Sequence, residues 1–238
     1  MSASSSAVPQ PRIRHQGPPA GMLASLYAVL FLIGLAPVTL FGGKPWFPGP
    51  WQPVGDMARF FELRAHAVLL CVFFQFGASV ALGLFTATIV NQMRFLGVRA
   101  AGVSIALFGG LATVFDSFAA AFGSWAMVQS GAAQTPALTS ALYYLSFAAG
   151  GPGFSVPMGL LMLGISIPAL IMKLLPRWIC VFGIALGVCG ELSWFAFLLH
   201  HAVPLIPLTR FPGMIFLIAA GFALPRSTTV QRPAQAWH

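Results

Sequence analysis

Long apolar runs dominate the pattern of hydrophobic and polar positions, and short polar turns separate them. The first run, Met22–Phe41, has about 20 residues, which is the length that an α-helix needs to cross the hydrocarbon core of a bilayer. Comparable runs follow at 66–92 and at Ala100–Val128. The pattern therefore predicts a chain of membrane-spanning helices.

The fourth apolar segment, Ala137–Leu175, is too long for a single crossing. As one helix it would be about 58 Å long, roughly twice the hydrocarbon thickness. Gly150-Gly151-Pro152-Gly153 interrupts it, so the sequence predicts an outer helical piece, Ala137–Ala149, followed by a full span, Phe154–Lys173. A bend from the interface into the bilayer explains this break, and a broken helix lining a transport site is the alternative.

Two further spans complete the predicted fold. One lies at Trp178–Leu199, and a short one lies at Pro212–Leu224, with a possible earlier start near Leu205. Ahead of the second span, the amphipathic stretch that begins at Asp56 is expected to lie partly in the outer interface. The predicted fold is an all-α polytopic membrane helix bundle with six transmembrane helices, a broken fourth helical element and an amphipathic outer segment before span two.

Composition and charge agree with this prediction. The chain is 58% hydrophobic and 7% charged, and its net charge is +8. Its 12 lysines and arginines are scattered singly or in pairs near the ends of apolar runs, which is typical of membrane anchoring and not of nucleic-acid binding. Three cysteines lie within apolar runs, so no disulfide framework is expected.

The distribution of basic residues predicts the orientation. With six spans and cytoplasmic termini, eight basic residues lie inside and four outside, whereas a seventh crossing at Ala137–Ala149 would place five inside and seven outside. The positive-inside rule favours six spans. We therefore expect a disordered cytoplasmic tail at 1–20, a membrane domain at 21–225 and a second cytoplasmic tail at 226–238. The outer residues in this count are Lys44, Arg59, Arg64 and Arg210.

Three polar residues within the spans are the candidate functional site. Gln75, Asp116 and Glu191 each belong to a stripe of small residues at helical spacing, and such stripes are where membrane helices approach closely. At about 1.5 Å per residue all three lie near mid-membrane. The hypothesis is a shared polar centre that handles a ligand or protons, and the alternatives are a purely structural hydrogen-bond cluster and separate, unconnected sites. No lysine or arginine falls inside the predicted spans as a counter-ion.

Three histidines at the outer ends of the spans form a second, weaker candidate site. His66, His200 and His201 could ligate a metal or haem together with nearby acids. HExxH and CxxC patterns are absent, however, and adjacent histidines point about 100° apart on a helix, so we favour interfacial histidines and predict no cofactor. The sequence also lacks phosphate-loop, GxSxG and GxGxxG motifs, which favours a non-enzymatic protein.

The segment Leu175-Pro176-Arg177-Trp178, followed by Gly183 and Gly187 in an apolar run, resembles a family of small bacterial six-span membrane proteins known only as a domain of unknown function. The order of spans is similar over most of the chain. The resemblance implies a bacterial cytoplasmic (inner) membrane, and it brings no catalytic residues. Three functions stay open: a protein that handles a small or lipophilic ligand or protons, a haem- or metal-binding redox subunit or enzyme, and an accessory or scaffold subunit. The expected partners are the lipid bilayer and other membrane proteins.

Overall fold

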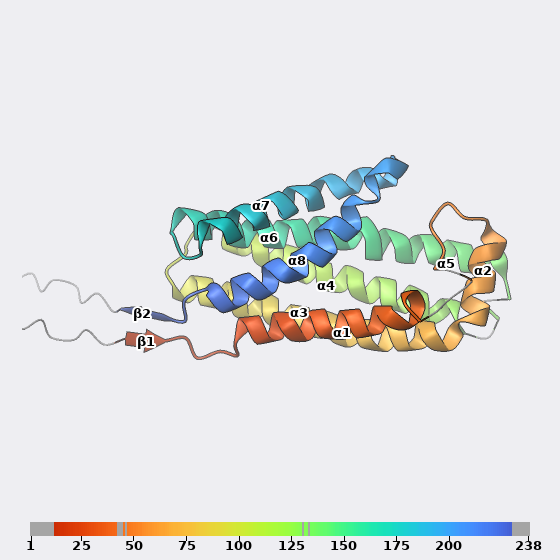
Figure 1. The fold of residues 1–238 in the computed structure, drawn as a ribbon, viewed down its shortest axis with the longest axis horizontal. Helices are drawn as coiled ribbons and strands as arrows, with labels where there is room; N and C mark the ends of the chain where they lie inside the picture. Colours follow the sequence, from red (N-terminus) through yellow and green to blue (C-terminus); the bar gives the residue numbers. More distant parts are fainter. Residues whose placement is uncertain (1–11, 42–44, 46, 130, 133, 230–238) are drawn as a thin grey trace, which may run out of the picture.

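The computed structural model describes residues 12–41, 45, 47–129, 131–132 and 134–229. Its long helices lie side by side along one axis (Figure 1). Within these ranges, six helical elements are long and apolar enough to cross a membrane, which confirms the predicted all-α, multi-pass fold. They are α1 (Ala20–Thr39), α3 (Ala65–Phe95), α4 (Ala101–Met127), α5 (Pro136–Ala148) joined to α6 (Phe154–Ile171), α7 (Arg177–Leu192) and α8 (Leu205–Ala223).

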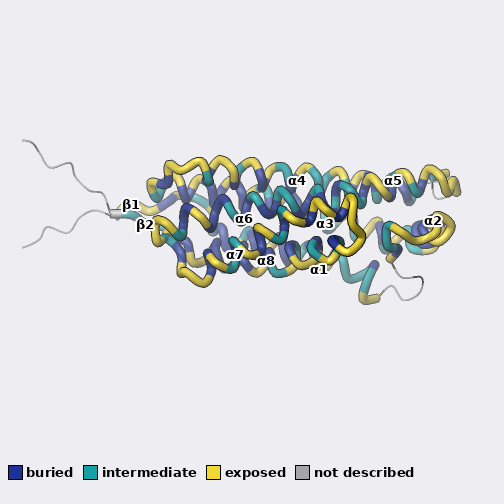
Figure 2. The backbone as a smooth tube through the Cα atoms, turned by 90° about the horizontal axis from the view of Figure 1, so that it is seen from above, coloured by how far each residue is buried: buried dark blue, intermediate teal, exposed yellow. Residues whose placement is uncertain are grey.

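The fourth element is interrupted where the sequence predicts, but it is not divided into two separately oriented pieces. A π-helical turn, Ala149–Gly153, joins α5 to α6, and the two form one rod in Figure 1. Its 36 residues correspond to about 54 Å at 1.5 Å per residue, which exceeds the hydrocarbon thickness. Consequently α5 extends past the other spans, beside the short helix α2 (Val54–Leu63), at the end of the bundle away from the termini (Figure 2).

The last span differs from the preferred prediction because α8 begins at Leu205 instead of Pro212. Two 3-10 turns, Ser193–Phe197 and His200–Ala202, connect it to α7. The earlier start places Arg210 inside the apolar span, not in the outer turn to which the sequence analysis assigned it. The expectation that no arginine lies within the spans is therefore wrong.

Helix α6 is at the centre of the packing, since it contacts α4, α7 and α8. Small residues bring these backbones close together. A Cβ on Gly109 of α4 would lie 2.5 Å from the Pro157 carbonyl oxygen and 2.6 Å from the Leu161 nitrogen. A Cβ on Gly159 of α6 would lie 2.7 Å from the Gly187 carbonyl oxygen of α7. The small-residue stripes at Gly109 and Gly187 therefore face neighbouring helices, as predicted.

The segments that flank the first and the last span pair with each other beside α3. Strand β1 (Arg12–Arg14) pairs antiparallel with strand β2 (Ser227–Thr229), and the backbone N–H of His15 donates to the Arg226 carbonyl at 2.8 Å. The buried Gln92 amide donates to the Leu224 and Pro225 carbonyls, each at 3.0 Å. Parts of the two segments that the sequence assigns to cytoplasmic tails, Arg12–Arg14 and Ser227–Thr229, thus form a strand pair. Residues 1–11 and 230–238 lie outside the described part of the chain.

The contact at Gly109 makes a testable prediction about stability. In Gly109→Ala the new methyl group would meet backbone atoms of α6, which cannot rotate away as a side chain can, so we expect the free energy of unfolding to fall by about 1–3 kcal/mol. Gly77→Ala on α3 is the matched control, because its methyl group would meet a single side-chain carbon, on Leu30, at 3.7 Å. Thermal unfolding of the purified variants tests this, and equal melting temperatures would refute close packing at Gly109.

Candidate functional site: a cavity around Arg210

Arg210 lies on α8 and reaches the π-helical turn of the fourth element. Its Nη2 donates a hydrogen bond to the Gly150 carbonyl oxygen. The guanidinium carbon lies 4.1 Å from the ring centroid of Phe154 and 5.4 Å from that of Phe31. A cation is therefore held inside the bundle between α1, α8 and the start of α6.

The Gly150 carbonyl can accept this bond because the π-helical turn interrupts the regular helical pattern. The N–H of Phe154 bonds to the Gly151 carbonyl, not to that of Gly150 four residues earlier. The Gly150 carbonyl within this turn is the acceptor that Arg210 uses.

These contacts explain how the charge is tolerated without a carboxylate. An arginine at the centre of a span costs roughly 2.5–3.5 kcal/mol on insertion scales. A hydrogen bond from a charged donor contributes about 1.5–3 kcal/mol, and each cation–π contact contributes about 0.5–2 kcal/mol. The gains are of the same size as the cost. Within the described chain, Arg210 makes no ion pair with an aspartate or glutamate, and its buried Nε has no hydrogen-bond partner.

Arg210 borders a cavity of about 250 Å³ in the half of the bundle away from the termini. The walls come from α1, α3, α4, α5 and α8, together with Phe47 and Phe61. Most of the lining is apolar or aromatic. Its polar side chains are those of Thr39, Gln75, Ser124, Tyr143, Ser146 and Arg210.

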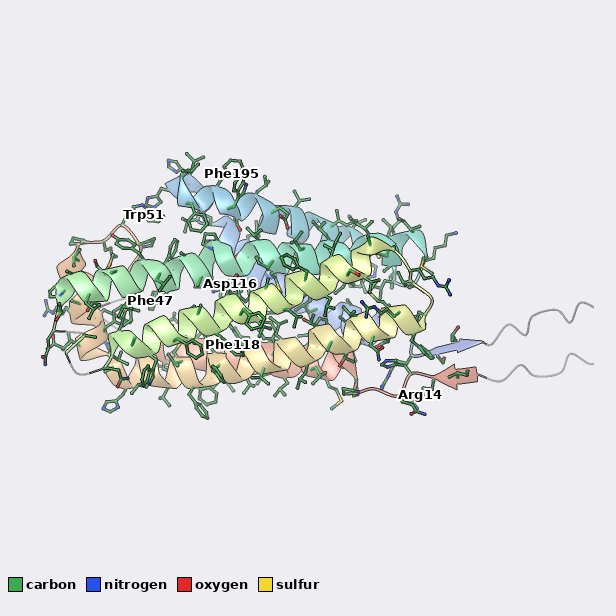
Figure 3. The ribbon with its side chains drawn as sticks, turned by 180° about the vertical axis from the view of Figure 1, so that it is seen from behind. Arg14, Phe47, Trp51, Asp116, Phe118 and Phe195 are labelled. Atoms are coloured by element: carbon green, nitrogen blue, oxygen red, sulfur yellow. The ribbon has the colours of Figure 1, made fainter. Side chains whose placement is uncertain are left out.

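The segment between α1 and α2 is fastened beside this cavity by two contacts. The Tyr143 hydroxyl donates to the Pro48 carbonyl, and the Trp51 ring stacks on His200 with centroids 3.6 Å apart and planes 16° apart. Phe47, from the same segment, lines the cavity. Figure 3 shows Phe47 and Trp51 at the end of the bundle away from the termini.

The structure does not gather the three predicted polar residues in one place. Gln75 lines the cavity with Arg210, whereas neither carboxylate does. The Asp116 carboxyl carbon lies 3.3 Å from the position of a Cβ on Gly153, and the buried Glu191 Oε1 lies 3.0 Å from that of a Cβ on Gly159. Asp116 thus approaches the fourth element from α4 and Glu191 approaches it from α7, and Figure 3 shows Asp116 in the middle of the bundle.

The predicted histidine site is not assembled in the described residues. His200 stacks on Trp51, and the centroids of His200 and His201 are 6.3 Å apart. His66 lies in the first turn of α3. Within the described ranges, no group of three or more histidine, cysteine, aspartate or glutamate side chains could hold a metal ion.

Comparison of the chain with protein-family models, with curated proteins and with solved structures gave no match. Fold and cavity together define an α-helical multi-pass membrane protein with a small internal cavity lined by one arginine.

The contacts that hold the segment between α1 and α2 make a testable prediction about how readily a reagent can enter the cavity. Cys71 lines the cavity and is half-buried, so the double variant Cys180→Ala/Cys189→Ala leaves it as a single thiol reporter. Adding Trp51→Ala removes the stack on His200 and should raise the rate of Cys71 labelling by N-ethylmaleimide several-fold. Trp125→Ala, which removes an exposed tryptophan of α4, should leave the rate unchanged. Equal rates in both variants would show that the stack does not restrict access.

Proposed function

We propose that this protein is a bacterial inner-membrane protein that binds a small, largely apolar ligand in the Arg210 cavity. The observation that carries the proposal is a cationic side chain, without a carboxylate partner among the described residues, at the wall of a mostly apolar cavity. Ligand sites typically combine apolar walls with a few placed polar groups. Ionisable groups within spans are by default functional candidates.

The size of the cavity limits the ligand. A volume of 250 Å³ equals that of about eight water molecules at roughly 30 Å³ each. Such a space suits a molecule of about ten non-hydrogen atoms and is too small for a haem or for a whole lipid. This supports the small-ligand hypothesis over the haem-binding alternative.

The basic residues support cytoplasmic termini more strongly once Arg210 is placed within a span. The expected outer side then has three basic residues against eight on the expected inner side. Arg210 lies thirteen residues before the end of α8 at Ala223, about 20 Å from that end at 1.5 Å per residue. In this orientation the cavity belongs to the outer half of the membrane, where it would receive a ligand from outside the cell or from the outer leaflet.

Proton handling at Asp116 and Glu191 stays a separate hypothesis, because neither side chain lines the cavity. Asp116→Asn and Glu191→Gln are therefore suitable controls. Under the proposed function, both variants should bind ligand as the unmodified protein does.

Blocking the cavity tests the proposed function. Benzoate and benzamide, each with nine non-hydrogen atoms, are the probes, and binding is measured from the rise in melting temperature of the purified protein. A ligand at about 100 times its Kd stabilises the folded state by about 2.7 kcal/mol. We expect at least one probe to stabilise the protein, and Ser124→Phe, which fills the cavity, to abolish the effect.

Ala119→Phe provides the matched control, since Ala119 is exposed on the same helix and is not part of the cavity wall. It should retain the full ligand-induced rise in melting temperature. Stabilisation that persists in Ser124→Phe would place the ligand elsewhere, and no stabilisation by either probe would refute the proposed function.

A further inference from the structure

We propose that the ligand is a monoanion, a carboxylate on a flat apolar body, and that Arg210 is the residue that selects it. This inference rests on the proposed function, because it assumes that the ligand occupies the cavity. Beyond the proposed function, it specifies the charge, the polar group and the shape of the ligand.

The charge of the ligand is inferred from the charged side chains that line the cavity. Among the described residues that line the cavity, Arg210 is the only lysine or arginine, and none is an aspartate or glutamate. A neutral ligand would displace water and leave the cation facing a less polar medium. A dianion would introduce an excess negative charge of its own. A single negative charge balances the site, and Coulomb attraction is stronger where water is excluded.

The carboxylate follows from the hydrogen-bond donors that remain free. A guanidinium has five N–H donors in a planar fork, and only Nη2 has a described acceptor, the Gly150 carbonyl. The Nε–H is buried away from the cavity, so the donors left for a ligand are those at the Nη1 and Nη2 end of the guanidinium. A carboxylate matches this planar geometry with two parallel hydrogen bonds. Gln75, which also lines the cavity, has an amide that can donate to the same group.

The flat, apolar shape of the ligand is inferred from the aromatic side chains of the cavity walls. Phe47, Phe61 and Phe147 contribute rings to the lining, together with aliphatic side chains from α1 and α3. Aromatic rings pack favourably against one another in edge-to-face or offset geometry. A benzene ring with one carboxylate has nine non-hydrogen atoms, which suits the volume of 250 Å³.

The discriminating experiment compares probes of the same shape in which a charged carboxylate is replaced by a neutral amide. Benzoate and benzamide have the same shape, as do hexanoate and hexanamide, and each affinity is obtained from the concentration dependence of the melting temperature in full-length purified protein. We expect benzoate to bind at least tenfold more tightly than benzamide, because a charge-assisted pair replaces a neutral one. Benzoate should also bind more tightly than hexanoate if the aromatic walls select a ring.

Arg210→Met should reduce the tenfold preference to about one while benzamide still binds, since the cavity keeps its walls. Arg210→Lys should retain a preference for benzoate, because it keeps the charge without the planar fork. The comparison within the unmodified protein decides the matter even where a variant does not fold. Equal or tighter binding of benzamide would overturn the anion inference and leave the proposed function intact. Tighter binding of hexanoate would overturn the flat body alone, and binding of none of the four probes would overturn both proposals.

Discussion

The contact between Arg210 and the Gly150 carbonyl is the interaction on which the rest of the candidate site depends. It joins the sixth span to the interrupted fourth element, and the Phe154 ring beside it lowers the cost of the charge. A regular α-helix would have used the Gly150 carbonyl in its own hydrogen bonds. The π-helical turn and the buried arginine thus support each other: the turn offers an acceptor, and the guanidinium donates to it within the span.

The bundle is packed differently in its two halves. In the half near the termini, Gly102, Gly109 and Gly164 allow α4 and α6 to touch through their backbones, and Gln92 closes the end of α3 against the C-terminal segment. In the other half, aromatic and polar side chains of α3, α4 and α5 surround the cavity. Close backbone contact in one half makes a rigid base.

Much of the fold could be predicted from the sequence, because span length, the glycine–proline break and the small-residue stripes are local signals. The site could be predicted only in part. Gln75 lines the cavity, but equal depth along the helix axes does not reveal which helices are neighbours, and Asp116 and Glu191 approach the fourth element from different helices. The place of Arg210 depends on where the last span begins, and a start at Pro212 leaves Arg210 outside the membrane. A span of 13 residues covers only about 20 Å, so the short length was the signal for an earlier start.

The pairing of β1 with β2 also sets an order of events during synthesis. Arg12–Arg14 precedes the first of the six spans, whereas its partner, Ser227–Thr229, follows the last of them. The strand pair can therefore form only after every helix has been translated. Until then Arg12–Arg14 has no partner in this two-stranded sheet. A product that stops within α8 therefore cannot form this strand pair.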